Sequence, residues 1–270
     1  MGAAQQALTM SGAAGGGSAP DQIAGMQLWI DATNPALLYQ TSGGSLVSAD
    51  GQTVDVAQDA GGLSRCMRQS TSGDRPTYKT NIVNGKSVLR FDGSTDFMVG
   101  NTTSAPGTAA SSLACSDLVS ASAGTYIVAL NVASARSAQA NAYQNDGIFA
   151  DQIGDNLGLS VSLSGATITF YAYNHDGSRD QATVMGAQST WHVVSMRHGG
   201  GNLEIRINGG SWVTVASGNT TQLTQPPFTG KGLTFSEPQW DLAHEAWWNV
   251  ALSDGDVTAV EDYFAAQLGL

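Results

Sequence analysis

Charged residues are scarce in this chain of 270 residues, and basic ones especially so. Lysine and arginine total 11 against 22 aspartates and glutamates, which gives a net charge of −11 at neutral pH. A protein this acidic repels phosphate backbones, so we exclude nucleic acid as a partner. Because only 12% of the residues are charged, most of the surface must be hydrated by hydroxyl and amide groups.

Cysteines are few, and long apolar runs and a secretion leader are missing. The two cysteines, Cys66 and Cys115, lack the spacing of a zinc or redox motif, and the sequence leaves open whether they pair. No apolar run approaches the roughly 20 residues of a membrane helix. The N-terminus has no basic segment followed by an apolar one. We therefore expect no membrane insertion and no cleaved leader.

Small residues dominate the first 24 positions, MGAAQQALTMSGAAGGGSAPDQIA, which show little hydrophobic periodicity. A segment of this composition has too little apolar surface to order itself. We assign residues 1–24 to a flexible, Gly/Ala/Ser-rich N-terminal arm and residues 25–270 to one folded domain.

Short strand-like runs separated by Gly, Asn and Asp follow the arm. They are rich in β-branched and aromatic residues, which is typical of an all-β sandwich. The clearest runs are Met26 to Asp31, Ser87 to Phe91, Thr125 to Asn131, Gly158 to Leu163, Thr167 to Tyr173, His192 to Arg197, Leu203 to Ile207 and Trp212 to Val215. Residues 101–124, rich in Ser, Thr and Ala, are expected to form a long surface loop.

Two local patterns are the most specific. The run from Leu203 to Ile207 alternates strictly between apolar and charged residues, which predicts a strand with one buried face. Asn208-Gly209-Gly210 then supplies the left-handed backbone of a hairpin turn. Helical spacing occurs near the end, after Ser253 as a good N-cap. It involves Val257, Val260, Glu261 and Phe264, of which the three apolar residues are expected to face the sandwich.

Four segments, taken in order, resemble the laminin-G-like jelly-roll domains, which are concanavalin-like sandwiches. These segments are Gly25 to Ala32, Arg75 to Gly93, Trp191 to Gly209 and Glu245 to Tyr263. The resemblance frames residues 25–268 and implies a laminin-G-like β-sandwich with a short C-terminal helix. Such domains occur in bacterial surface proteins and in tailed-phage virion proteins, and related sandwiches include lectins, hydrolases, adhesins and structural modules.

Three further features, the missing leader, the Gly/Ala/Ser-rich N-terminal arm and the absence of catalytic signatures, favour a non-catalytic accessory protein on the surface of a phage virion, as a head decoration, tail appendage or fibre component. Residues 1–24 would dock on other virion subunits in an oligomeric assembly, and the sandwich would face outward towards host-surface glycan. The alternative is a carbohydrate-binding module or adhesin of a bacterial surface or extracellular protein.

Catalytic motifs are missing. The glycosidase branch of this superfamily carries a Glu-x-Asp-x-x-Glu strand, which this sequence lacks, and its four glutamates stand apart from one another. A catalytic carboxylate pair would have to come from separate strands. We predict no enzymatic activity. The third hypothesis is an enzyme whose catalytic carboxylates come from separate strands and therefore form no sequence motif.

Two groups of loop carboxylates are candidate calcium ligands, because calcium selects hard oxygen donors. The first group is Asp146, Asp151 and Asp155, and the second is Asp176 and Asp180. Their Asn-Asp-Gly and Asp-Gly sequences are also typical of hairpin turns. We therefore predict that no cofactor is required and keep calcium as an alternative.

A glycan site of the usual kind needs exposed aromatic side chains on which a sugar can stack. The candidate residues are Tyr173, His175, Trp240, Trp247 and Trp248. Adjacent Trp247 and Trp248 must point to opposite faces if their segment is a strand, which would allow one of them to be exposed. Packing in the core or against another subunit is the alternative. Trp29 and Trp191 lie in the family-like strands and are assigned to the core.

Overall fold

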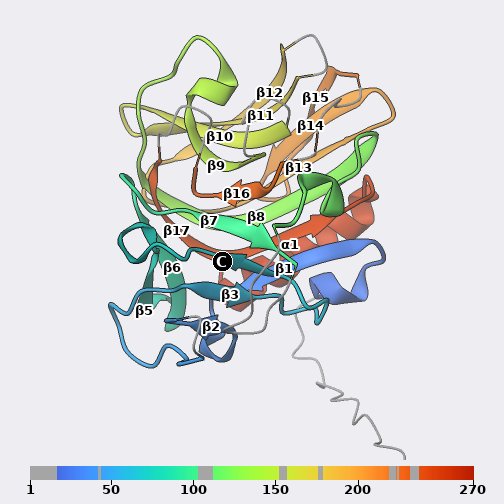
Figure 1. Cartoon of the computed structure of the whole chain (residues 1–270). Helices are drawn as coiled ribbons and strands as arrows, with labels where there is room; N and C mark the ends of the chain where they lie inside the picture. The colour runs from blue at the N-terminus through green and yellow to red at the C-terminus, as the bar shows by residue number, and fades with distance from the viewer. Residues whose placement is uncertain are drawn as a thin grey trace, which may run out of the picture.

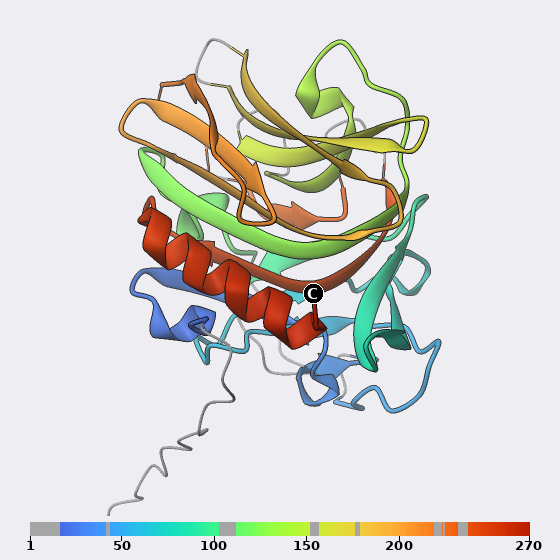
Figure 2. The ribbon, with the colours of Figure 1, turned by 180° about the vertical axis from the view of Figure 1, so that it is seen from behind.

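Two antiparallel β-sheets are stacked face to face, and one long helix lies on the outside of the stack (Figure 1 and Figure 2). The computed structural model describes residues 17–41, 44–102, 112–151, 157–175, 179–218, 223, 225–231 and 237–270. The prediction of an all-β sandwich with a C-terminal helix is confirmed.

The strands within the described residues divide into an eight-stranded and a nine-stranded sheet. The first pairs β15 (Val213–Ala216), β14 (Asn202–Ile207), β13 (Trp191–Gly199), β8 (Ala123–Ser134), β17 (Gln239–Trp248), β6 (Lys86–Asp92) and β5 (Thr77–Val83), and β1 (Met26–Asp31) also pairs with β17. The second pairs β12 (Arg179–Ala187), β11 (Thr167–His175), β10 (Leu157–Ser164), β9 (Asp146–Asp151), β16 (Pro227–Thr229), β7 (Met98–Asn101), β4 (Cys66–Arg68), β3 (Val56–Gln58) and β2 (Leu38–Tyr39).

Every strand run expected from the sequence falls on a strand, and β1 has the predicted bounds. The hairpin between β14 and β15 is also confirmed, because Asn208 and Gly209 have φ angles of 51° and 68°. The helix α1 (Asp254–Leu268) begins after Ser253, whose hydroxyl accepts a hydrogen bond from the Asp256 N–H. Short 3₁₀ helices span Pro20–Gln22, Pro35–Leu37, Ser72–Asp74, Cys115–Asp117 and Ala142–Gln144.

Strand β17 buries both of its faces. Leu242 and Trp247 contribute to the core between the sheets, whereas Ala246 and Trp248 belong to a second apolar layer that includes residues of α1. The apolar side of α1 completes that layer, where Val257, Val260 and Phe264 have no exposed surface. Figure 2 shows α1 lying along the outside of the sheet. The helix therefore covers an apolar face that would otherwise meet water.

Residues 17–24, which we assigned to the arm, belong to the folded sandwich. The Ser18 N–H donates to the Ala259 carbonyl of α1 at 3.0 Å, and a Cβ on Gly17 would lie 2.2 Å from the Tyr263 nitrogen. Only glycine allows the chain to approach the helix this closely. Pro20 is buried as well. Residues 1–16 lie outside the described residues.

The predicted surface loop at 101–124 is wrong for its second half. Leu113, Cys115, Leu118 and Val119 are buried in the core between the sheets, whereas Ser116 and Asp117 of the 3₁₀ turn are exposed. Both cysteines are buried, and burial raises the pKa of the Cys66 thiol to about 12. In the described part of the chain, no helix has the length and apolar character needed to cross a membrane.

Glu245 is a carboxylic acid inside the core between the sheets. It has no exposed surface, and it accepts hydrogen bonds from the hydroxyls of Tyr126 and Thr229, each at 3.0 Å. Burial raises the pKa of Glu245 to about 7, although these hydrogen bonds act in the opposite direction. The folded protein therefore holds a proton that the unfolded chain releases at lower pH.

Replacing Glu245 with glutamine should flatten the pH dependence of stability. A raised acid pKa makes the free energy of unfolding fall as pH rises from the ordinary glutamate value to about 7, here by up to about 3 kcal/mol. Glutamine keeps the shape of the protonated acid and does not titrate. Urea unfolding between pH 4 and 8 measures the difference, with Asp262→Asn as an exposed control. Parallel curves for Glu245→Gln and wild type would contradict this account.

Candidate functional site

The tryptophans proposed as a stacking platform are buried. Trp240, Trp247 and Trp248 have no exposed surface. Trp240 stacks on Phe91 with ring centroids 4.6 Å apart, and Trp247 packs on Phe149 at 4.2 Å. Trp247 and Trp248 do point to opposite faces, but both faces are covered. Their indoles are therefore closed to a sugar in this structure, which corrects the prediction.

The other two candidate glycan residues lie on β11. Tyr173 is only 4% exposed, and it packs where a Cβ on Gly158 of the neighbouring strand would fall 2.3 Å from its hydroxyl. Tyr173 is thus also closed to a sugar. The side chain of His175 lies outside the described residues.

The calcium candidates are spread over different strands. Asp146 on β9 is buried and ion-paired with Arg136, whose Nε lies 2.8 Å from its carboxylate, so calcium would have to displace an arginine. Asp180 lies on β12, and two strands separate it from β9, a distance of about 14 Å. The side chain of Asp151, and Asp155 and Asp176 entirely, lie outside the described residues. Among the side chains that are described, no group of three or more His, Cys, Asp or Glu is placed to hold a metal.

A different site emerges beside α1, and we call it the Glu261 pocket. It has a volume of about 340 Å³, near the lower end of the range for small-molecule sites. Strand β13, the β14–β15 turn and the last turns of α1 form its walls. Its lining residues are Trp191, Val193, Asn208, Gly209, Glu261, Asp262, Ala265 and Leu270.

Glu261 lines this pocket and uses only one of its two carboxylate oxygens in hydrogen bonds to the described residues. Its side chain is 4% exposed, and its Oε1 accepts from the Arg206 Nε at 2.9 Å and from the Ser195 hydroxyl. Its Oε2 is buried and has no hydrogen-bond partner among the described residues. A Cβ on Gly209, another lining residue, would lie 3.8 Å from that Oε2. The unused oxygen therefore lies behind the Gly209 turn, closed to solvent in this structure, and a ligand in the pocket would reach it where that turn moves aside.

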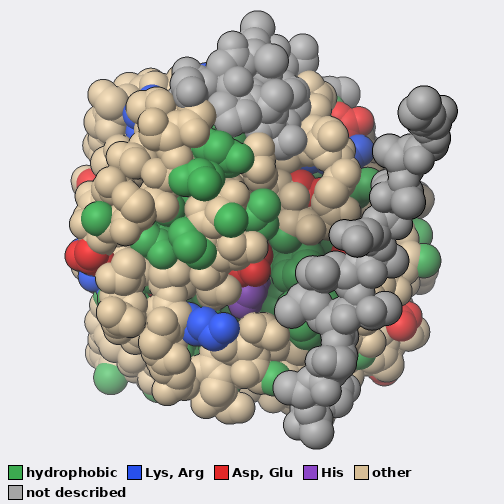
Figure 3. Space-filling view, turned by 90° about the horizontal axis from the view of Figure 1, so that it is seen from below, with side chains coloured by type: hydrophobic (Ala, Val, Ile, Leu, Met, Phe, Trp, Pro, Cys, Tyr) green, Lys and Arg blue, Asp and Glu red, His purple; other side chains and the backbone are tan. Residues whose placement is uncertain are grey.

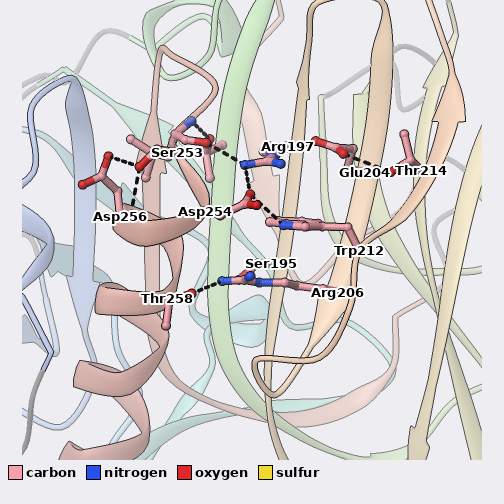
Figure 4. A network of polar contacts seen from close by, with 12 residues as sticks. Ser195, Arg197, Glu204, Arg206, Trp212, Thr214, Ser253, Asp254, Asp256 and Thr258 are labelled. Carbon is pink, nitrogen blue, oxygen red and sulfur yellow. Dashed lines mark hydrogen bonds and ion pairs between the residues drawn. The ribbon is translucent and has the colours of Figure 1, made fainter.

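A polar network fixes Arg206 and hence Glu261 (Figure 4). Arg206 donates to Thr258 at 2.9 Å, and its guanidinium lies 4.6 Å from the ring centre of Trp212. On the other side of Trp212 lies Arg197, 4.3 Å from the same ring and 2.7 Å from Asp254. Two strands and the helix are thus tied together around one indole, and Glu261 is held in place.

The turn that closes the pocket is fixed in the same way. The Asn208 side chain accepts from the Val193 N–H at 2.9 Å and lies 3.1 Å from the His192 Nδ1. The other His192 nitrogen lies 3.0 Å from the Ala187 carbonyl, so it must be the protonated one, and Nδ1 accepts from Asn208. The pocket therefore has a defined wall before any ligand arrives.

Two acidic side chains line the pocket, Glu261 and Asp262, and the charge of Glu261 is balanced by Arg206. Trp191 was assigned to the core, but it is only partly buried and lines this pocket. An indole and carboxylate oxygens suit a ligand that has an apolar face and several hydroxyl donors. Figure 3 shows that charged groups are sparse in the view from below too: where described residues are drawn, tan and green atoms predominate, with isolated blue and red ones.

Comparison with solved structures identifies β-sandwich domains of similar fold. The binding domain of botulinum neurotoxin serotype D aligns over 88% of this chain and 52% of its own, with a TM-score of 0.53 and 12% identity. A ligand-binding domain of the same serotype, in complex with N-acetylneuraminic acid, aligns over 88% and 51%, with a TM-score of 0.52 and 12% identity. A Trypanosoma rangeli sialidase aligns over 91% and 33%, with a TM-score of 0.53 and 11% identity.

These similarities establish the sandwich fold. The chain spans about half the length of the neurotoxin domains that it matches. No protein-family model and no curated protein matches the sequence. The site must therefore be interpreted from its own residues.

Arg206→Gln should destabilise the protein strongly, by about 3–5 kcal/mol, because it leaves the Glu261 carboxylate buried without its cation. Lys79→Gln breaks the more exposed Lys79–Asp50 pair and should cost far less, because solvent screens that pair. Urea unfolding at pH 7 compares the two. Equal small losses would show that Arg206 does not hold Glu261 as described.

Proposed function

We propose that this chain is a non-catalytic carbohydrate-binding β-sandwich whose binding site is the Glu261 pocket. The observation that carries the proposal is the unpartnered, buried Oε2 of Glu261 beside a partly exposed Trp191. A sugar ring offers an apolar C–H face for the indole and hydroxyl donors for the carboxylates. One sugar ring can therefore contact both the indole and the carboxylates of the pocket.

The charge of the pocket selects the kind of sugar. Arg206 balances Glu261, which leaves the charge of Asp262 in a lining that has no lysine or arginine, and the whole protein carries a net charge of −11. A negatively charged sugar would be repelled. We therefore propose a neutral sugar unit as the ligand of this pocket.

The structural neighbours support binding rather than catalysis. Two of them are binding domains of a neurotoxin, and one of these was solved with N-acetylneuraminic acid bound. The sialidase is an enzyme of similar fold at 11% identity. A carbohydrate-binding module is the function that fits both these neighbours and the pocket, with a place at an extracellular or virion surface.

The virion role is a second proposal, in which the N-terminal segment docks the sandwich on other subunits of a phage particle. Its support is the attachment of Gly17 and Ser18 to α1. Whatever precedes residue 17 leaves the domain at a fixed point on the helix. Docking there would leave the rest of the sandwich free to meet host glycan.

Trp191→Ala and Glu261→Gln should each weaken glycan binding about tenfold or more, which is about 1.4 kcal/mol. A glycan array with the full chain identifies a neutral ligand, and isothermal titration calorimetry then measures its affinity for each variant. Met185→Ala, at an exposed side chain on β12, is the matched control and should bind as wild type does. A ligand whose affinity survives both pocket variants would place the site elsewhere.

Removing residues 1–16 should leave a folded domain that no longer assembles. Residues 17–24 must be kept, because they pack on α1 and β17. The expected result is an unchanged melting temperature together with a smaller mass in light scattering, or loss from assembled particles. A shortened chain that assembles like the full one would exclude the segment as the docking element.

A further inference from the structure

A second and larger pocket lies at the other edge of the eight-stranded sheet, beside the β5–β6 hairpin. We call it the Lys86 groove. Its volume is about 490 Å³. It is lined by Thr33, Pro35, Ser48, Ala49, Asp50, Tyr78, Thr80, Asn81, Gly85, Lys86 and Ser87. Hydroxyls, an amide and two charged side chains therefore surround one opening.

An irregularity in β5 forms one wall of this groove. The pairing of β5 with β6 shifts register between Lys79 and Val83, and Asn81, in the middle of the shift, has a φ angle of 56°. A non-glycine residue in the left-handed region is uncommon within a strand, and bulges of this kind redirect side chains. Here the bulge brings Thr80 and Asn81 to the groove.

The acid of the groove is already neutralised. The Asp50 carboxylate accepts from the Lys79 ammonium at 2.7 Å and from the Thr80 N–H at 2.9 Å. These two hydrogen bonds hold the pKa of Asp50 below its usual value. Asp50 is therefore ionised, and the charge of Lys79 balances it.

Lys86 is the cation that remains. It lines the groove and is partly buried, and it forms no ion pair with any carboxylate of the described residues. Asp31 lies in the same region but does not line the groove. Its carboxylate accepts two hydrogen bonds from Thr33. The groove thus carries one net positive charge on a strongly acidic protein.

We propose that the Lys86 groove binds a sugar unit bearing a carboxylate, with that carboxylate on the Lys86 ammonium and the sugar hydroxyls on the side chains of Thr80 and Asn81. A charge-assisted hydrogen bond to a partly buried ammonium is stronger than a neutral one. The surrounding hydroxyls and amide then distinguish a sugar acid from a simple anion. This site is separate from the Glu261 pocket and does not depend on sugar binding there.

The test uses the full chain labelled with ¹⁵N and two probes, glucuronate and its neutral counterpart glucose. Glucuronate should shift the amide signals of Thr80, Asn81 and Gly85 in a saturable way, and glucose should not. Lys86→Gln should weaken glucuronate binding at least tenfold. Asp50→Asn should strengthen it several-fold, because it removes an anion and leaves Lys79 unbalanced beside the groove.

Lys231→Gln is the matched control. It removes the same charge from a lysine that lies over the rings of Phe97 and Phe228, and it should leave the binding constant within about twofold of wild type. Equal responses to glucose and glucuronate, equal losses in Lys86→Gln and Lys231→Gln, or shifts confined to Gly209 and Glu261 would each overturn the proposal. Acetate as a third probe separates a sugar-acid site from a site for any carboxylate: acetate binding as tightly as glucuronate would also overturn it.

Discussion

Burial of strand β17 on both faces is the constraint on which the rest of the structure depends. Trp247 fills the core between the sheets, and Trp248 points out of it. An outward indole on a central strand must be covered, and residues of α1 and the chain around Ile23 form that cover. The helix lies where it does because of this apolar layer, and the Glu261 pocket exists because the helix passes the edge of β13.

The sequence was informative wherever a strand or helix carries its own signal. Alternation located β14, paired left-handed residues located the hairpin turn, and Ser253 located the start of α1. The shortest strands of the nine-stranded sheet carry little such signal: β3, β4 and β16 are three residues each. These segments form strands because neighbouring strands pair with them, and their local sequence has no pattern that predicts this pairing.

The residues of the proposed site were harder to predict, because accessibility depends on the layer above each residue. Trp248 was a reasonable candidate for exposure on a two-layer sandwich, and a third layer buries it. Glu261 is the opposite case, because the sequence did not mark it as a candidate and it lines the pocket. It sits among Val257, Val260 and Phe264 at helical spacing, and a carboxylate within an apolar helical stripe was the available sign of a buried partner. The partner itself, Arg206, comes from a strand some 55 positions away and has no trace in the local sequence.

A buried carboxylate with one oxygen satisfied and one unused has a consequence for affinity. Taking Glu261 out of water costs free energy, and Arg206 and Ser195 offset part of that cost through Oε1 alone. The free energy needed to take Oε2 out of water is not offset, and it is spent during folding, before any ligand is present. In the proposed complex, a sugar hydroxyl that reaches Oε2 past the Gly209 turn would gain a hydrogen bond without removing a bound partner, against a wall already fixed by Asn208 and Trp212. Part of the cost of binding would in this way already be met during folding.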